Sequence, residues 1–206
     1  MRGYTITRDK FMSPGEVRTL LTTCESRAIV DIAKGRQTWV KRHMLVHLAV
    51  HSGLRVSEIA ALKVGDLHIN GKATCLIVQH GKGDRRREVY LDKDLVRHLK
   101  EYIKTKESAW GEPVDEAAPL FLGQKGQHYT TTALQLSFKK AIREAGLPER
   151  YSIHSSRHTY ATILLSKTNN LRFVQKQLGH ASLNMTSLYA DVLPEANQTL
   201  ADAILG

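Results

Sequence analysis

Residues 67–91, LHINGKATCLIVQHGKGDRRREVYL, break the helical patterns that run through the rest of the chain. Apolar and β-branched side chains gather there in three short runs, Leu67–Ile69, Ala73–Gln79 and Glu88–Leu91. Asn70 and Gly71 stand between the first two runs, and this dipeptide is typical of a two-residue hairpin turn. Gly81 and Gly83 flank Lys82 and predict a tight, exposed turn before the third run. The stretch therefore predicts a three-stranded antiparallel sheet.

Helical patterns lie on both sides of this predicted sheet. Ser13, Pro14 and Glu16 combine a capping box with a proline at the first helical position, so a helix is expected to begin there. Further helices are expected over Thr38–Ser52, Val56–Leu62, a segment capped by Asp92, a segment opened by Thr131, His154–Ser166, Arg172–Leu178, Asn184–Tyr189 and Pro194–Leu205. The predicted fold class is mainly α with a small three-stranded antiparallel β-sheet (α+β). The 206 residues are expected to form one domain over residues 13–206, after an extension over residues 1–12.

The charge balance is the broadest indication of function. Thirty Lys and Arg residues against twenty Asp and Glu residues give a net charge of +10 and a pI of about 9.7. Such an excess is typical of nucleic-acid-binding proteins. No apolar run is long enough to cross a membrane, and the N-terminus lacks the apolar core of a signal peptide, so a cytoplasmic protein is expected. Cys24 and Cys75 show no metal-ligand spacing and are expected to be buried, reduced thiols.

Polar residues gather in short clusters that precede a C-terminal tyrosine: Gly53–Glu58, Gly81–Gly83, His154–His158 and Leu178–His180. Attack on a phosphodiester by a side chain needs a nucleophile, cationic donors for the phosphate oxygens and an acid for the leaving oxygen. The arginines, lysine, histidines and tyrosine of these segments could supply each of these parts, and the guanidinium of arginine is a planar, permanently charged fork that matches phosphate. The histidines of these clusters have no neighbouring cysteine or carboxylate cluster, so no metal site is expected among them.

In this order and with these spacings, the clusters resemble the catalytic domain of the tyrosine recombinases, the phage-integrase and Xer-like family. The resemblance runs from about Ser13 to the C-terminus and departs from the family pattern at Ser156, where leucine is usual. It implies a site-specific DNA recombinase (integrase) that cleaves and rejoins strands through a 3′-phosphotyrosyl intermediate and a Holliday junction. It implies no cofactor, metal or ATP, because the covalent link conserves the phosphodiester energy.

The resemblance also implies a role for each residue of a catalytic set. The two arginines would hold the scissile phosphate, and the tyrosine would attack it. Lys82 would protonate the departing 5′ oxygen, although a solvated basic turn is the alternative interpretation of its cluster. His154 would assist proton transfer, and His180 would donate a hydrogen bond to a non-bridging oxygen. The complete set is Arg55, Lys82, His154, Arg157, His180 and Tyr189.

Other residues are given supporting roles. Glu58 is expected to orient Arg55 or a neighbouring helix, and His158, next to Arg157, is expected to be a packing histidine. Two basic runs are expected to contact the DNA backbone, with an ordinary solvated charge run as the alternative. These runs consist of Arg85, Arg86, Arg87, Lys139 and Lys140.

The resemblance finally implies an assembly and leaves some alternatives open. The partner would be double-stranded DNA, and the protein would form a homotetramer on paired sites and a monomer when free in solution. Family members usually carry a separate N-terminal core-binding domain, which this chain is expected to lack. The predicted helix Pro194–Leu205 would dock on a neighbouring protomer or on its own domain. Type IB topoisomerase-like strand cleavage and a non-catalytic DNA-binding module are the alternative functions.

Overall fold

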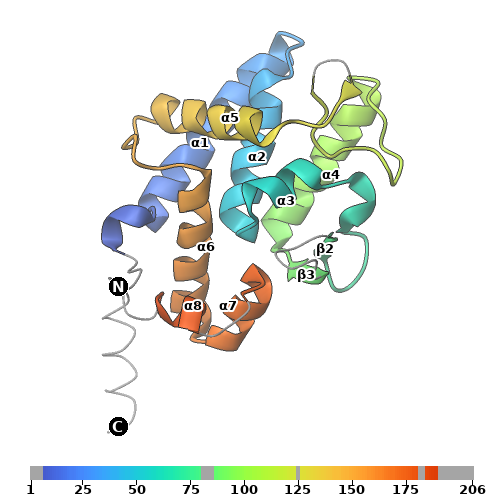
Figure 1. Ribbon diagram of the computed structural model, residues 1–206. Coiled ribbons are helices and arrows are strands. Elements are labelled where there is room, and N and C mark those ends of the chain that lie inside the picture. The colour runs from blue at the N-terminus through green and yellow to red at the C-terminus, as the bar shows by residue number, and fades with distance from the viewer. Residues whose placement is uncertain (1–6, 80–85, 124–125, 181–183, 190–206) are drawn as a thin grey trace, which may run out of the picture.

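The computed structural model describes residues 7–79, 86–123, 126–180 and 184–189 (Figure 1). The helices in these ranges are α1 (Pro14–Ala33), α2 (Thr38–Ser52), α3 (Val56–Ala61), α4 (Lys93–Ser108), α5 (Thr131–Glu144), α6 (Ile153–Thr168), α7 (Leu171–Leu178) and α8 (Asn184–Ser187). The strands are β1 (Leu67–His68), β2 (Cys75–Val78) and β3 (Arg87–Tyr90), and short 3-10 turns cover η1 (Arg8–Lys10) and η2 (Val64–Asp66). The predicted fold class is confirmed. The expected helix over residues 194–205 lies outside the described residues.

Local capping signals set the first helices as predicted. The Ser13 hydroxyl accepts a hydrogen bond from the Glu16 amide at 3.2 Å, and the Glu16 carboxylate accepts one from the Ser13 amide at 2.7 Å. α2 ends at Gly53, which has a φ of 62°, in the left-handed region that favours glycine. This stop turns the chain at once, so that Arg55 begins α3 as its N-cap.

The sheet has the order β1-β2-β3 and is antiparallel throughout, but its first connection differs from the predicted turn. Pairing of β1 with β2 stops where His68 faces Cys75, which leaves a loop longer than two residues. Neither Asn70 nor Gly71 has the positive φ that a type I′ turn requires. Ile69 is only 5% exposed and packs into the core. The prediction of a two-residue Asn-Gly turn was therefore wrong, because burial of Ile69 draws the chain away from the ladder.

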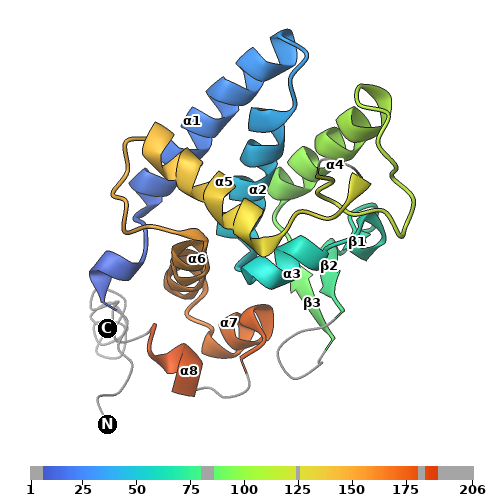
Figure 2. The same cartoon turned by 45° about the horizontal axis from the view of Figure 1, so that its top comes forward.

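Two apolar clusters hold the elements together. The larger one joins α1, α2, α4, α5 and the sheet around side chains such as Leu20, Met44, Leu76 and Phe138. The smaller one joins α6 and α7 to the segment after α8, and it includes Tyr189. Figures 1 and 2 show α7 and α8 next to one end of α6. Burial of each large apolar side chain contributes roughly 1.5–3 kcal/mol to stability. The smaller cluster therefore holds the end of the described chain against α6.

Other expectations about the fold are met in part. Cys24 is buried and Cys75 is half-buried, and both are free thiols. Ser156, which departs from the family pattern, is fully buried, and its hydroxyl donates to the Ile153 carbonyl at 2.7 Å. A buried hydroxyl with a partner does not disturb packing. Among the described helices, none is long and apolar enough to cross a membrane.

Candidate active site

A buried carboxylate organises the arginines at the start of α3. Arg55 donates to Glu58 through its backbone amide and its Nη1, each at 2.8 Å. Arg87 of β3 donates to both oxygens of the same carboxylate through Nη1 and Nη2, again at 2.8 Å. Burial alone would raise the pKa of Glu58, but the hydrogen bonds and charge of Arg87, together with the hydrogen bonds from Arg55, lower it to about 2. The predicted contact between Glu58 and Arg55 is therefore present, and a second arginine reinforces it.

Arg157 of α6 joins the ends of two other helices. Its Nη1 donates to the Gly53 carbonyl at 2.6 Å, and its Nη2 donates to the Leu178 carbonyl at 2.7 Å. These carbonyls lie at the C-terminal ends of α2 and α7, where the helix dipole favours a cation. Burial, and then the charge of Arg55, lowers the pKa of Arg157 to about 10, which leaves the guanidinium charged at neutral pH.

Tyr189 is buried beside two histidines. Its hydroxyl lies 3.0 Å from Nδ1 of His158, and its ring is stacked with that of His180 at a centroid distance of 6.4 Å. The Nδ1 of His180 lies 3.0 Å from the Thr186 hydroxyl. Burial, and then the charge of Arg157, lowers the pKa of both histidines, to about 4 in the case of His180. Both imidazoles are therefore mainly neutral at pH 7.

The charges of these residues act on one site. Beyond burial, the charges of Arg157, Arg55 and Arg87 all lower the pKa of His180, which stacks on the tyrosine. The carboxylate of Glu58 neutralises one of these three guanidinium charges. The three arginines and Glu58 together therefore carry two excess positive charges. An arginine fork matches the oxygens of a phosphate. The arrangement can therefore hold a phosphate group near a tyrosine hydroxyl.

The predicted catalytic residues are placed unevenly. The structure brings together Arg55, Arg157, His180 and Tyr189. His154 lies in the first turn of α6 and is exposed, while Lys82 lies outside the described residues. His158, expected to pack, reaches the tyrosine hydroxyl instead. Positions 154 and 158 share one face of the helix, and the second is the deeper of the two.

The first basic run turns inward where the strand begins. Arg85 lies outside the described residues, Arg86 is exposed, and Arg87 donates through Nε to the Gln177 carbonyl at 3.2 Å in addition to its pairing with Glu58. Residues two apart in a strand point to the same face, and Val89 is fully buried. This alternation was the signal that would have predicted an inward Arg87. Contacts of this run with DNA stay a prediction.

The second basic run also divides into an internal and an external residue. Lys139 donates to the backbone carbonyls of Glu149 and of Tyr151, the latter at 3.0 Å. Lys140 is exposed. Lys140 therefore has the exposed surface that a phosphate contact would need, while Lys139 has internal partners in the segment that precedes α6.

The site leaves no room for a side chain at Gly53. A Cβ there would lie 2.4 Å from Cδ1 of Tyr160 and 3.0 Å from Cδ2 of Leu178, and the φ is left-handed. Gly53→Ala is expected to lower the free energy of unfolding by about 2–4 kcal/mol, measured by urea denaturation. Gly35→Ala is the matched control, because Gly35 has a φ of 64° and no atom within 4 Å. Equal losses in the two variants would contradict a role for the Tyr160 contact.

Comparison with known proteins identifies relatives of this chain. The model of the phage integrase family matches residues 10–196. The chain is 32% identical over 159 residues to the tyrosine recombinase XerC of Bradyrhizobium diazoefficiens, which covers 76% of this chain and 48% of that protein. The chain thus spans about half the length of the curated relatives it matches.

Solved structures share the architecture. The crystal structure of XerH recombinase bound to its difH substrate, in a pre-cleavage complex, has a TM-score of 0.72 and 29% identity, covering 87% of this chain and 50% of that one. The crystal structure of XerA recombinase has a TM-score of 0.76 at 23% identity, covering 98% of this chain and 66% of that one, and shows the same fold. The family model spans most of the sequence and the fold agrees with it. The chain therefore belongs to the phage integrase family.

Proposed function

We propose that this chain is the catalytic part of a site-specific DNA recombinase that cleaves and rejoins double-stranded DNA. The observation that supports this most strongly is the meeting of two arginine forks, two neutral histidines and one buried tyrosine hydroxyl in a single site. The similarity to XerC, a tyrosine recombinase, and to XerH bound to its DNA substrate supports the same function.

The proposed reaction is attack of Tyr189 on a phosphodiester. The tyrosine oxygen forms a bond to phosphorus as the bond from phosphorus to the 5′ oxygen breaks. The products are a 3′-phosphotyrosyl link and a free 5′-hydroxyl, and the family resemblance assigns the protonation of that oxygen to Lys82. One phosphoester replaces another, so the same site can rejoin the strand by the reverse reaction.

The arginines would stabilise the charge that develops on the phosphate. A guanidinium carries five N–H donors, and the two described contacts of Arg157 use one donor on each terminal nitrogen. The remaining donors of Arg157, with those of Arg55, would bind the non-bridging oxygens. Because the backbone carbonyls and Glu58 fix both guanidinium planes beforehand, little reorganisation is needed during the reaction.

The histidines would supply the proton acceptor and a further donor. When the proton of His158 is on Nε2, its Nδ1 accepts the hydrogen of the Tyr189 hydroxyl at 3.0 Å. When Nδ1 of His180 accepts from the Thr186 hydroxyl, Nε2 of that ring carries the hydrogen and would donate a hydrogen bond to a non-bridging oxygen. His154 keeps its predicted part in proton transfer, one turn nearer the exposed end of α6.

His158→Ala is expected to slow formation of the covalent DNA adduct by about 100-fold or more, because the tyrosine loses its proton acceptor. The wild-type rate should fall as the pH drops below the pKa of His158, which burial lowers from its usual value, since a protonated ring cannot accept. Single-turnover rates between pH 5 and 8 measure both effects. His154→Ala is the matched comparison. If His154→Ala removes the pH dependence and His158→Ala does not, His154 accepts the proton. The contact between His158 and the Tyr189 hydroxyl would then be a packing contact only.

Adduct formation tests the proposed function directly. Nicked duplexes with randomised sequence around the nick are incubated with the 206-residue chain and separated on a denaturing gel. Cleavage just before the nick releases a short oligonucleotide, so the protein stays covalently bound and the captured DNA can be sequenced. We expect a retarded band and an enriched sequence. Absence of any adduct across the pool would overturn the assignment.

The assembly and the type of strand exchange are part of the same proposal. A homotetramer on two duplexes is expected to form with the selected site, and sedimentation of the complex measures its mass. Recombination between two copies of that site should give exchanged products. Relaxation of supercoiled plasmid that lacks the site, without exchange between sites, would favour the topoisomerase-like alternative.

A further inference from the structure

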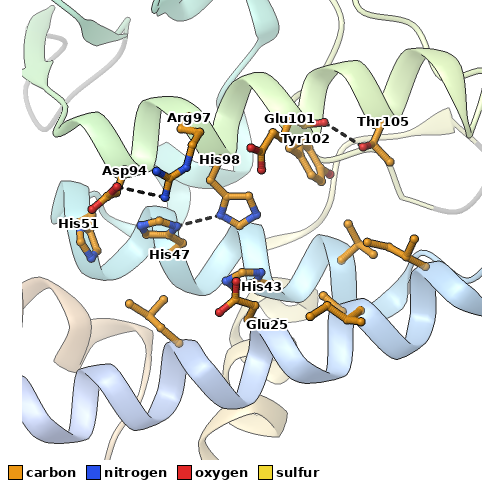
Figure 3. A pocket seen from close by; sticks show the side chains of 15 residues that line it. Glu25, His43, His47, His51, Asp94, Arg97, His98, Glu101, Tyr102 and Thr105 are labelled. Carbon is orange, nitrogen blue, oxygen red and sulfur yellow. Dashed lines mark hydrogen bonds and ion pairs between the residues drawn. The ribbon is translucent and has the colours of Figure 1, made fainter.

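Three histidine side chains meet in a groove between α1, α2 and α4 (Figure 3). Tyr189 does not line this groove. His43 and His47 come from α2, four residues apart and so on one face of that helix, and His98 faces them from α4. The Nδ1 atoms of His47 and His98 are 2.8 Å apart, and the ring centroids of His43 and His98 are 4.3 Å apart. The groove, with a volume of about 610 Å³, leads solvent to these rings.

The spacing of these nitrogens is close to that of a three-histidine metal site. One ring nitrogen from each of the three histidines lies within 4.8 Å of the other two. A tetrahedral zinc site with bonds of about 2.0–2.1 Å places its nitrogen ligands about 3.3 Å apart. To share one ion, the 2.8 Å pair must open slightly and the wider separations must close. The three rings are thus already gathered around a point that one ion could occupy.

The surroundings keep the three imidazoles in the form that binds metals. Burial lowers the pKa of His43 and, to about 3, those of His47 and His98, so that all three are neutral at pH 7. Glu25 of α1 lies beside His43 in Figure 3 and offers a negative charge to a bound cation. The charged groups that face the cluster from α4 are Asp94, Arg97 and Glu101, and Arg97 is paired with Asp94 at 3.1 Å.

We propose that His43, His47 and His98 bind one divalent transition-metal ion of the zinc type. Imidazole nitrogen suits zinc, copper, nickel and cobalt, whereas magnesium and calcium require oxygen ligands. The fourth position faces the groove and is completed by water or by Glu25. The ion acts as a clip between α2 and α4. This proposal departs from the sequence expectation, which was that the protein holds no metal and which weighed only the histidines of the C-terminal clusters.

An ion between α2 and α4 would help to hold two arginines of the active site in position. α2 ends at Gly53, just before Arg55, and α4 follows directly after β3, which carries Arg87. An ion that fixes α2 to α4 therefore fixes the two segments that present these arginines to Glu58. Binding to the folded state alone also raises its stability by mass action.

The test uses the 206-residue protein, freed of metal by a chelator and titrated with zinc chloride in a calorimeter. We expect one ion per chain, and a rise in Tm of roughly 5–10 °C at a free zinc concentration 100 times the Kd. Cobalt should give the visible absorption of a tetrahedral site. Neither result requires DNA cleavage, so the test is independent of the proposed function.

Three variants locate the ion. His43→Gln and His98→Gln should each weaken zinc binding more than about 100-fold and abolish the rise in Tm. His68→Gln is the matched control, because His68 is an exposed histidine on β1. Circular dichroism without metal shows whether each variant is folded. Zinc binding that is equally strong in all three variants would mean an adventitious ion only and would overturn the proposal.

A measurement on the wild type covers the case of an unfolded variant. Diethylpyrocarbonate modifies accessible imidazole nitrogens, and mass spectrometry identifies each modified histidine. Zinc should protect His43, His47 and His98 and leave His68 and His154 reactive. Absence of zinc protection at the three cluster histidines would contradict the site.

Discussion

Tyr189→Phe is expected to abolish the covalent DNA adduct while leaving the fold and DNA binding nearly unchanged. The substitution removes one oxygen from a side chain that is 3% exposed, and the phenyl ring still fills its place in the cluster with α6 and α7. The lost hydrogen bond to His158 is worth only about 1 kcal/mol. The nucleophile itself is gone, so no phosphotyrosyl bond can form. A denaturing gel with the selected nicked duplex measures the adduct, and fluorescence anisotropy measures binding.

Tyr160→Phe is the matched control for this loss. Tyr160 lies on α6 and packs against the same cluster, and its hydroxyl donates to the side-chain oxygen of Gln177 at 3.3 Å. Its removal also deletes one oxygen and one hydrogen bond, so a similar small change in stability is expected. The adduct should form at the wild-type rate. An adduct that survives Tyr189→Phe, or one that is lost in Tyr160→Phe, would contradict the choice of nucleophile.

Arg157→Lys is expected to reduce the rate of adduct formation by about 100- to 1,000-fold. The ammonium keeps the charge but is a single point with three donors, so it cannot reach the carbonyls of Gly53 and Leu178 and a phosphate together. Single-turnover cleavage at saturating protein measures the loss. Binding of non-specific DNA should change little, because other basic residues supply most of that affinity.

Lysine is chosen at position 157 because Arg157 is buried. Arg157→Ala would leave two buried carbonyls without this donor, which would lower the free energy of unfolding by about 1–3 kcal/mol for each carbonyl. A slower reaction of that variant could then reflect lost stability instead of lost catalysis. Arg86→Lys is the control, since Arg86 is an exposed neighbour of the inward-turned Arg87. If Arg157→Lys cleaves at the wild-type rate while Tyr189→Phe does not, Arg157 supports the helix ends and makes no contribution to phosphate chemistry.

Local signals in the sequence were enough to predict most of the elements. The capping box at Ser13 and the glycine stop at Gly53 each act within one helical turn, so neighbouring residues determine them. The same holds for the class of the fold, because the change of period at β2 and β3 is local. The Asn-Gly turn failed because burial of Ile69 in the distant core outweighed the preference of the dipeptide.

Contacts between side chains that are far apart in the sequence could not be predicted from these local signals. The resemblance pointed to the arginines and the tyrosine. It did not predict that the fork of Arg87 on Glu58 joins β3 to α3, or that the contact of His158 with Tyr189 joins α6 to the segment after α8. The histidine cluster of α2 and α4 is of the same kind. His43 and His47 show helical spacing, yet only the packing of α4 on α2 adds His98.

One measurement tests the central proposal most directly: the position of the covalent bond between protein and DNA. The adduct is digested with nuclease and trypsin, and tandem mass spectrometry locates the nucleotide that stays attached to a peptide. We predict a nucleotide linked through its 3′-phosphate to Tyr189. Attachment to any other residue, or linkage through a 5′-phosphate, would contradict the proposed chemistry.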